Sequence, residues 1–220
     1  MRIANGRRLY ERPTSDAETD RRLVREHKWA FDAVTPGTVM GPYYPVTNKP
    51  RRAGTDLARL PGHRAMARGR LLYVVGRLVD VSGRPIVGAG IEIWQANAKG
   101  RYSHPSDGNS APLDRNFAGY GVTRTGVDGE FCFKTIFPGG YPVVPGWDRA
   151  PHIHFLITGR RDRHVTQMWF PGHPLNQQDR LLKNLGPGER ARLVARLESP
   201  SSSMEHASRV VRFDIVLTNG

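Results

Sequence analysis

Short segments in which apolar residues alternate with polar ones, or form brief apolar runs, recur after residue 70 of this chain. Side chains on a strand alternate between two faces, so this pattern predicts β-strands. The predicted strands are 71–81, 90–95, 130–136, 152–158, 165–170 and 209–217. Turn signals such as Ser82-Gly83-Arg84-Pro85 and Val127-Asp128-Gly129 separate them. Helical spacing predicts short helices only over 19–31 and 188–197.

The fold expected from this pattern is all-β: a β-sandwich core with a basic N-terminal arm and one or two short helices. The 24 Gly and 17 Pro residues also favour strands and turns over a helical bundle. A length of 220 residues suits one domain overall. Within it, we expect residues 1–70 to form an N-terminal arm and rim segment, and residues 71–220 to form the β-sandwich domain.

The chain is strongly basic, with 33 Lys and Arg against 20 Asp and Glu, a formal net charge of +13. Such an excess can attract nucleic acid, an anionic small molecule or an acidic partner chain. No nucleic-acid-binding motif accompanies the arginines, so we expect a solvated surface and no nucleic-acid partner. A single cysteine, Cys132, excludes an internal disulfide framework. The N-terminal residues lack an apolar core and no stretch resembles a membrane span, which predicts a cytoplasmic protein without a membrane partner.

Two histidines separated by one residue, His152 and His154, stand at the start of the predicted strand 152–158. Residues two apart on a strand share a face, so both imidazoles would point to the same place, as two ligands of one metal do. Ile153 and Phe155 would form the apolar face of a half-buried strand. A lone pair of this kind is more often two packed or surface histidines, so its neighbours decide its meaning.

Two tyrosines at Gly-rich turns are the candidate neighbours. Tyr102 follows Gly100, and Tyr141 follows Gly139-Gly140. Zinc prefers cysteine, histidine and carboxylate ligands, whereas two anionic phenolates with two imidazoles suit a hard trivalent iron. A tyrosine at a turn is usually a packing residue, so neither tyrosine alone indicates a metal site.

A series of ordered motifs carries a family resemblance. They are residues 41–45, 76–80, 93–97, 100–102, 113–117, 135–142, 149–154 and 212–217. In order and spacing they resemble the intradiol ring-cleavage dioxygenases, and within that family the iron-bearing (beta) subunits of the protocatechuate 3,4-dioxygenases. The resemblance covers roughly residues 40 to 217 and implies a β-sandwich enzyme with a non-haem Fe(III) centre.

The resemblance assigns four metal ligands. Tyr102 matches the equatorial tyrosinate of the family, and Tyr141 matches the axial tyrosinate that is released when substrate binds. His152 and His154 match the equatorial and axial histidines. The released Tyr141 would also act as a catalytic base for the substrate.

Two further residues gain catalytic roles from the resemblance. Arg149 matches an arginine that lies beside the reacting carbon, where a cation would stabilise developing negative charge. Gln167 matches a glutamine that supports the site from behind the ligands. The alternatives are a surface arginine and an ordinary polar strand residue.

The implied substrates are a small aromatic 1,2-diol, protocatechuate or a related catechol, and O2, and the implied product is a muconate-type diacid. The implied assembly is a homo-oligomer or a hetero-oligomer with a sister chain. Two alternatives stay open: a non-catalytic partner subunit, against which the four ligand residues argue, and a β-sandwich ligand-binding module. The colour of the purified protein would distinguish a ferric enzyme from a binding module.

The sequence departs from the family pattern at two places. Family members usually carry Arg-Pro-Ala before the first histidine, whereas this chain has Arg149-Ala150-Pro151. We therefore expect a changed loop next to His152. A tryptophan commonly follows the Tyr-Pro pair, whereas Val143 and Val144 follow it here. The loss of a large ring would reshape the pocket, so these positions leave the ring substituents of the substrate open.

Overall fold

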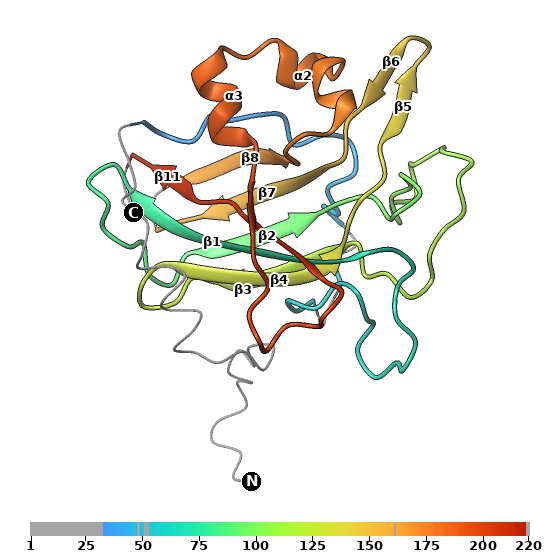
Figure 1. Cartoon of the computed structure of the whole chain (residues 1–220), viewed down its shortest axis with the longest axis horizontal. Coiled ribbons are helices and arrows are strands. Elements are labelled where there is room, and N and C mark those ends of the chain that lie inside the picture. The colour runs from blue at the N-terminus through green and yellow to red at the C-terminus, as the bar shows by residue number, and fades with distance from the viewer. Residues whose placement is uncertain (1–32, 48, 51–52, 161, 219–220) are drawn as a thin grey trace, which may run out of the picture.

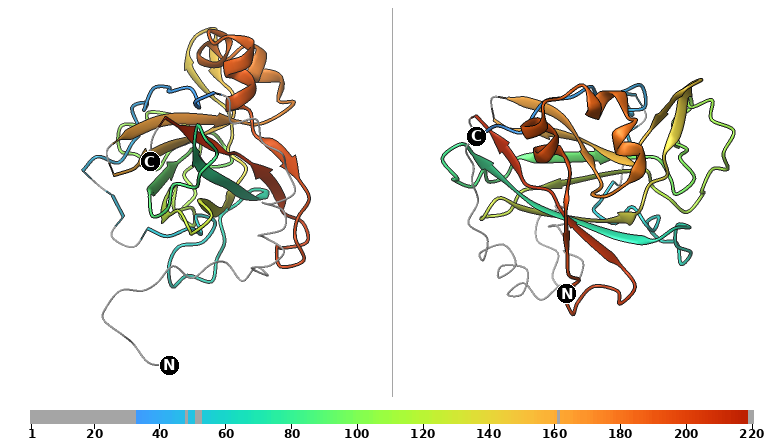
Figure 2. Two further views of the ribbon diagram at one scale, coloured as in Figure 1. Left: turned by 90° about the vertical axis from the view of Figure 1, so that its left-hand side faces the viewer. Right: turned by 45° about the horizontal axis from the view of Figure 1, so that its top comes forward.

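A computed structural model describes residues 33–47, 49–50, 53–160 and 162–218 (Figure 1). Two β-sheets pack face to face, which confirms the predicted all-β sandwich. The described helical segments are short: a 3₁₀ turn η1 (Pro174–Gln177), α2 (Arg180–Lys183) and α3 (Pro187–Leu193). They lie together at one side of the sandwich, next to a two-stranded ribbon (Figures 1 and 2).

The first sheet is built around the long strand β1 (Leu71–Asp80). The strand β4 (Glu130–Ile136) pairs antiparallel with one edge of β1. Along its other edge β1 pairs in parallel with β10 (Arg209–Arg212) and then with β11 (Ile215–Leu217). The short strand β9 (Arg196–Glu198) extends the sheet beyond β10.

The second sheet is antiparallel and carries the histidine strand near its centre. Its order is β3 (Tyr120–Arg124), β2 (Gly90–Trp94), β7 (His152–Thr158) and β8 (Arg163–Trp169). The ribbon consists of β5 (Tyr141–Val144) and β6 (Trp147–Arg149), and it leads directly into β7. The sheet therefore fixes β7, while the ribbon places Tyr141 and Arg149 beside the start of that strand.

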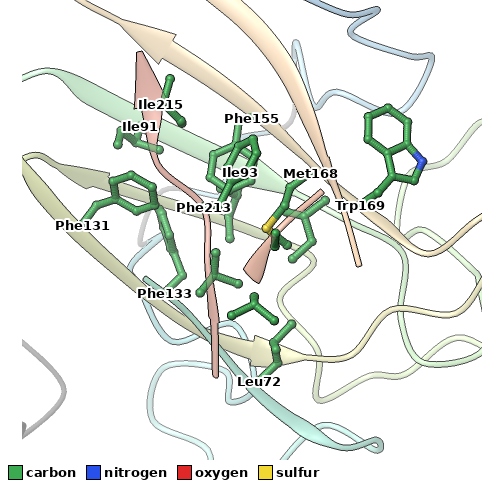
Figure 3. Packing of buried hydrophobic residues seen from close by; sticks show 14 of the residues in the cluster. Leu72, Ile91, Ile93, Phe131, Phe133, Phe155, Met168, Trp169, Phe213 and Ile215 are labelled. Carbon is green, nitrogen blue, oxygen red and sulfur yellow. The ribbon is translucent and has the colours of Figure 1, made fainter. Parts of the chain in front are cut away.

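The core lies between the sheets and takes one face of β7. Ile153, Phe155 and Ile157 are fully buried in it, among aromatic and branched side chains from both sheets (Figure 3). The prediction of a half-buried strand was wrong for the other face, because His152 and His154 are each only 2% exposed. A smaller cluster that includes Tyr44, Trp94, Tyr102 and Leu156 covers that face.

The predicted 209–217 strand is interrupted, because β10 ends at Arg212 and β11 begins at Ile215. At the break the Phe213 backbone N–H donates to the Val75 carbonyl, and the Asp214 carboxylate accepts the Arg77 N–H. Gly76 permits this approach, because a Cβ there would lie 2.0 Å from the Phe213 carbonyl oxygen. Contacts between distant segments thus divide a pattern that reads as one strand.

Other boundaries also differ from the prediction. The expected helix 188–197 ends at Leu193, because the Ala195 N–H donates to the Trp169 carbonyl and the chain then forms β9. The strands β3, β5, β6 and β9 were not predicted; β5, β6 and β9 have only three or four residues each, which is too short for a clear alternation. The helix predicted over 19–31 lies outside the described residues.

The described part of the N-terminal segment packs on the sandwich. The Thr35 N–H donates to the Val216 carbonyl, and the Thr38 N–H donates to the Val165 carbonyl. Leu57 is fully buried in the main core. The division at residue 70 into arm and sandwich domain stays a prediction. Within the described ranges, no helix has the length and apolar character needed to cross a membrane.

Candidate active site

The two strands that flank β7 fix the two histidines. His154 pairs with Trp94 on β2 and with Gln167 on β8, and His152 pairs with Trp169 on β8. The Trp94 indole stacks on the His154 imidazole, with the ring centroids 4.8 Å apart and an interplanar angle of 9°. As the alternation predicts, both imidazoles lie on the same face of β7, and their Nε2 atoms are 3.2 Å apart.

Both tyrosine hydroxyls lie close to the same nitrogen. The Tyr102 hydroxyl oxygen is 3.4 Å from His152 Nε2, and the Tyr141 hydroxyl oxygen is 3.5 Å from it. Two ligands that each lie about 2.1 Å from one ion, as imidazole nitrogens do with zinc, are at most about 4.2 Å apart. The Tyr102, Tyr141 and His154 donor atoms each lie within this limit of His152 Nε2, so each of them could share one ion with His152.

Glycines at the two tyrosine turns allow the convergence. A Cβ on Gly100 would lie 2.2 Å from the Gly140 carbonyl oxygen, and Gly100 has a φ of +81°. The turn before Tyr102 and the turn before Tyr141 therefore touch through their backbones. This contact brings together residues that are 39 positions apart in the chain.

The two tyrosines are held differently. Tyr102 is 3% exposed, its N–H donates to an Asp107 carboxylate oxygen at 2.7 Å, and its ring packs on Tyr43 at 4.6 Å. Tyr141 is only partly buried and stands at the first position of the ribbon strand β5. The Tyr102 side chain is thus fixed in the interior, whereas Tyr141 lies at the edge of the site.

Burial keeps the imidazoles neutral. It lowers the pKa of His152 and of His154 well below the usual value, and the Arg149 charge lowers both further. His152 Nδ1 lies 2.7 Å from the Ala150 carbonyl, which can only accept a hydrogen bond. The proton of neutral His152 therefore sits on Nδ1, and the lone pair of Nε2 faces the cluster, as metal binding requires.

The phenols need a cation to ionise. Burial raises the pKa of Tyr102 well above its usual value, and it also raises the pKa of Tyr141, where the Arg149 charge acts in the opposite direction. A trivalent ion between two phenolates and two neutral imidazoles would compensate both negative charges. Among the described residues, no three His, Cys, Asp or Glu side chains gather into a possible metal site. Two phenolate oxygens with two imidazole nitrogens form a donor set that fits a hard ferric ion.

Arg149 is buried next to the cluster rather than exposed. It is 5% exposed, its Nε donates to Asp179 Oδ2 at 3.0 Å, and its Nη2 donates to Gln167 Oε1 at 2.6 Å. Gln167 is fully buried and its Nε2 donates to the Val39 carbonyl at 2.8 Å. The structure thus joins Arg149 and Gln167, the two residues that the resemblance paired with the ligands.

Sequence reasoning missed Asp179, which is fully buried and binds Arg149. An aspartate immediately before a helix is ordinarily explained as an N-cap, and Asp179 does cap α2. The order Arg149-Ala150-Pro151 provides Asp179 with a second hydrogen-bond donor, because the Ala150 N–H also donates to Asp179 at 3.0 Å. A proline at position 150 would have no N–H to give.

A surface pocket opens beside Tyr102 but is not the centre of the cluster. Its walls include Tyr43, Trp94, Tyr102, His104 and Tyr120, and three prolines also line it. Tyr141, Arg149, His152 and His154 do not line it. It therefore touches the site only through Trp94 and Tyr102.

Comparison with known proteins identifies a family for this chain. A family model described as "Dioxygenase" matches residues 39–219. The chain belongs to this dioxygenase family. The protocatechuate 3,4-dioxygenase beta chain of Burkholderia cepacia is 42% identical over 153 residues, which are 68% of this chain and 65% of that protein. The 6-chlorohydroxyquinol 1,2-dioxygenase of Cupriavidus pinatubonensis is 34% identical over 141 residues, 57% of this chain and 46% of the relative. The chain thus spans about half to two thirds of the length of these relatives.

Solved structures of the family have the same fold. The dioxygenase domain of a carbohydrate-binding fusion protein from Streptomyces sp. SirexAA-E is similar with a TM-score of 0.60 and 28% identity, over 86% of this chain and 100% of that domain. Hydroxyquinol 1,2-dioxygenase from Pseudomonas putida DLL-E4 has a TM-score of 0.64 over 90% of this chain and 70% of that one, at 22% identity. The resemblance to intradiol dioxygenases drawn from the short motifs is therefore confirmed.

Proposed function

We propose that this dioxygenase family member is a non-haem Fe(III) intradiol enzyme, which cleaves an aromatic 1,2-diol with O2 between the two hydroxyl-bearing carbons. The observation that carries the proposal is the approach of two tyrosine hydroxyls and a second imidazole to His152 Nε2, within 3.2 to 3.5 Å. Tyr102, Tyr141, His152 and His154 would hold the iron. When bound, ferric iron would draw electron density from a diolate and so make its ring reactive toward O2.

Tyr141 would serve as the base for the diol. A diol must lose its hydroxyl protons to bind as a dianion, and a phenolate that leaves the metal can accept one of them at its own oxygen. Tyr141 suits this role better than Tyr102, because it is partly exposed and belongs to the ribbon, whereas Tyr102 is buried beneath Tyr43. Tyr102 would stay in place and preserve the site while Tyr141 moves.

Arg149 would stabilise the negative charge that develops on the ring as it reacts. Its guanidinium is buried beside the ligands, where a fixed charge acts more strongly than in water. Nε and Nη2 are bound by Asp179 and Gln167, while the remaining Nη has no hydrogen-bond partner among the described residues. Gln167 would therefore help to orient Arg149.

The substrate would be protocatechuate or a related catechol, and the product a muconate-type diacid. The names of the relatives support this range, since they include enzymes for protocatechuate, hydroxyquinols and catechol. Val143 and Val144, which stand where the family commonly has a tryptophan, are 44% and 49% exposed on the ribbon beyond Tyr141. They would leave more room for ring substituents than an indole does.

A sister chain or further copies of this chain would complete the assembly. The relative that is 42% identical over 153 residues is named as a beta chain. A purely non-catalytic subunit would have no need of four converging metal-binding side chains, and these therefore favour a catalytic chain.

The decisive experiment follows O2 uptake by the iron-loaded protein with a panel of diols, and identifies the product by mass and absorption. We expect one O2 to be consumed per diol and a colourless muconate-type diacid to form. A yellow semialdehyde, the product of cleavage beside the diol, would reject the intradiol assignment. A colourless protein that takes up no iron would reject the metal site itself.

A further inference from the structure

Asp179 is a buried carboxylate that collects hydrogen bonds from three parts of the chain. Its Oδ2 accepts from Arg149 Nε at 3.0 Å, from the Ala150 N–H at 3.0 Å and from Trp169 Nε1 at 3.1 Å. Its Oδ1 accepts from the Leu181 N–H at 3.0 Å. The side chain is fully buried. Only Oδ1 is engaged in capping α2, so the cap does not account for the bonds at Oδ2.

The N-cap and the first residue of α2 hold the two ends of the ribbon strand β6. Asp179 binds Arg149 at the last position of β6, and the Arg180 guanidinium lies 5.2 Å from the Trp147 ring centroid at the first position. The Arg149 guanidinium also lies 5.9 Å from the Trp169 ring. The α2 segment, far from the ligands in the sequence, thus sets where β6 and its arginine lie.

The charges explain why a carboxylate is needed at this place. An arginine that is 5% exposed would be strongly destabilised without a negative partner. Asp179 supplies that negative charge at Nε of the guanidinium, and Gln167 accepts a hydrogen bond from Nη2. The planar guanidinium is therefore fixed in rotation as well as in position.

We propose that Asp179 is a positioning residue for catalysis, which holds the Arg149 guanidinium in the orientation that stabilises charge on the reacting ring. The proposal rests on the proposed function, because it assigns Arg149 a role in that reaction. The side-chain partners of Asp179 among the described residues are Arg149, the Ala150 and Leu181 N–H groups and Trp169, and not the proposed metal ligands. Its proposed effect on the reaction is exerted through Arg149, whose Nε it binds.

The test compares Asp179→Asn with a control variant that should also lower the stability of the protein but lies away from the site. Asparagine keeps the volume and caps a helix as well as aspartate does, but it brings no charge to Arg149. Leu182→Ala is the control, because Leu182 is 2% exposed in the same helix α2 and contacts the core rather than the site. We expect Asp179→Asn to lower kcat by about 100-fold, as misplacement of a catalytic group does, with KM and iron content near wild type. Leu182→Ala should lower Tm and keep kcat.

A double-mutant cycle separates positioning from general damage. If Asp179 acts through Arg149, adding Asp179→Asn to Arg149→Ala should change kcat by about twofold or less. If the loss of kcat in the double variant equals the product of the losses in the two single variants, the proposal is overturned. A kcat for Asp179→Asn equal to that of Leu182→Ala would also overturn it. Asp179→Ser, which keeps a capping oxygen, should repeat the kinetic loss; failure of both Asp179 variants to fold would show that the carboxylate is structural.

Crystal structures of the wild-type and Asp179→Asn iron proteins give a readout that does not depend on activity. The wild type should show Arg149 Nε on Asp179, and the variant a rotated guanidinium above an unchanged set of four ligands. An unmoved guanidinium would contradict the proposal. If the wild type cleaves no diol but shows this geometry, the proposed function fails while the control of Arg149 by Asp179 stands.

Discussion

Tyr141 and Arg149 are directly paired across the β5–β6 ribbon. Tyr141, which is expected to leave the metal, and Arg149, which is expected to stabilise the reacting ring, are therefore carried by the same two-stranded ribbon. The strand that carries Arg149 is fixed to α2 through Asp179 and through Trp147 on Arg180. Beyond Tyr141, the other strand carries the exposed Val143 and Val144. This asymmetry suits a fixed cation next to a displaceable ligand.

Metal content and colour follow from the two phenols. The purified protein should bind stoichiometric iron and absorb in the visible, because phenolate-to-ferric charge transfer colours such sites. Tyr141→Phe should weaken or shift the absorption band, and the remaining absorption should come from the Tyr102 phenolate. Metal analysis and an absorption spectrum check this prediction. Stoichiometric zinc with no visible band would show that the site was assigned wrongly.

Arg149→Ala should affect turnover more than substrate binding. An interaction confined to the transition state appears in kcat, and we expect a loss of about 100-fold or more. The variant should also be less stable, because it leaves the buried Asp179 carboxylate without its cation. Iron content should stay near wild type, since Arg149 is not a ligand. Full turnover in the variant would remove Arg149 from the mechanism.

Gly100→Ala should separate the two tyrosine turns. The new Cβ would lie 2.2 Å from the Gly140 carbonyl oxygen, so one turn must shift and the phenols can no longer converge. We expect a large loss of iron and of visible absorption. Gly88→Ala is the matched control, because Gly88 has a similar φ of +74° with nothing within 4 Å of the added Cβ. It should cost roughly 1–2 kcal/mol of stability, because an alanine Cβ is strained at positive φ, and it should leave iron binding intact. Equal iron loss in both variants would point to backbone strain instead.

Gly76→Ala should destabilise the β-sandwich, whether or not the protein binds a metal. Its Cβ would lie 2.0 Å from the Phe213 carbonyl oxygen and 2.6 Å from Phe131 Cζ, where β1 meets the break between β10 and β11. Overpacking of this kind costs about 3 kcal/mol, which corresponds to a fall in Tm of roughly 6–12 °C for a chain of this size. Gly54→Ala meets nothing within 4 Å and should leave Tm almost unchanged. Thermal unfolding of the two variants decides the matter.

Sequence alone determined the local features of the site. The alternation around His152 and His154 predicts that both imidazoles share one face, because the period of two is a property of the extended backbone. The limits of the strand His152–Thr158 agree with the prediction for the same reason. The motifs around Tyr102, Tyr141, Arg149 and Gln167 indicated the family, since their spacing recurs in it.

Only the tertiary structure decided how these residues meet. No local pattern predicts that the turn at Gly100 touches Gly140, that Trp94 stacks on His154, or that segment 33–47 and the Tyr102 loop bury the second face of β7. Asp179 has an adequate local explanation as a helix cap, and its partner Arg149 stands 30 residues earlier. Such contacts depend on the packing of whole sheets and helices, because hydrogen bonds and burial act between neighbours in space and not between neighbours in sequence.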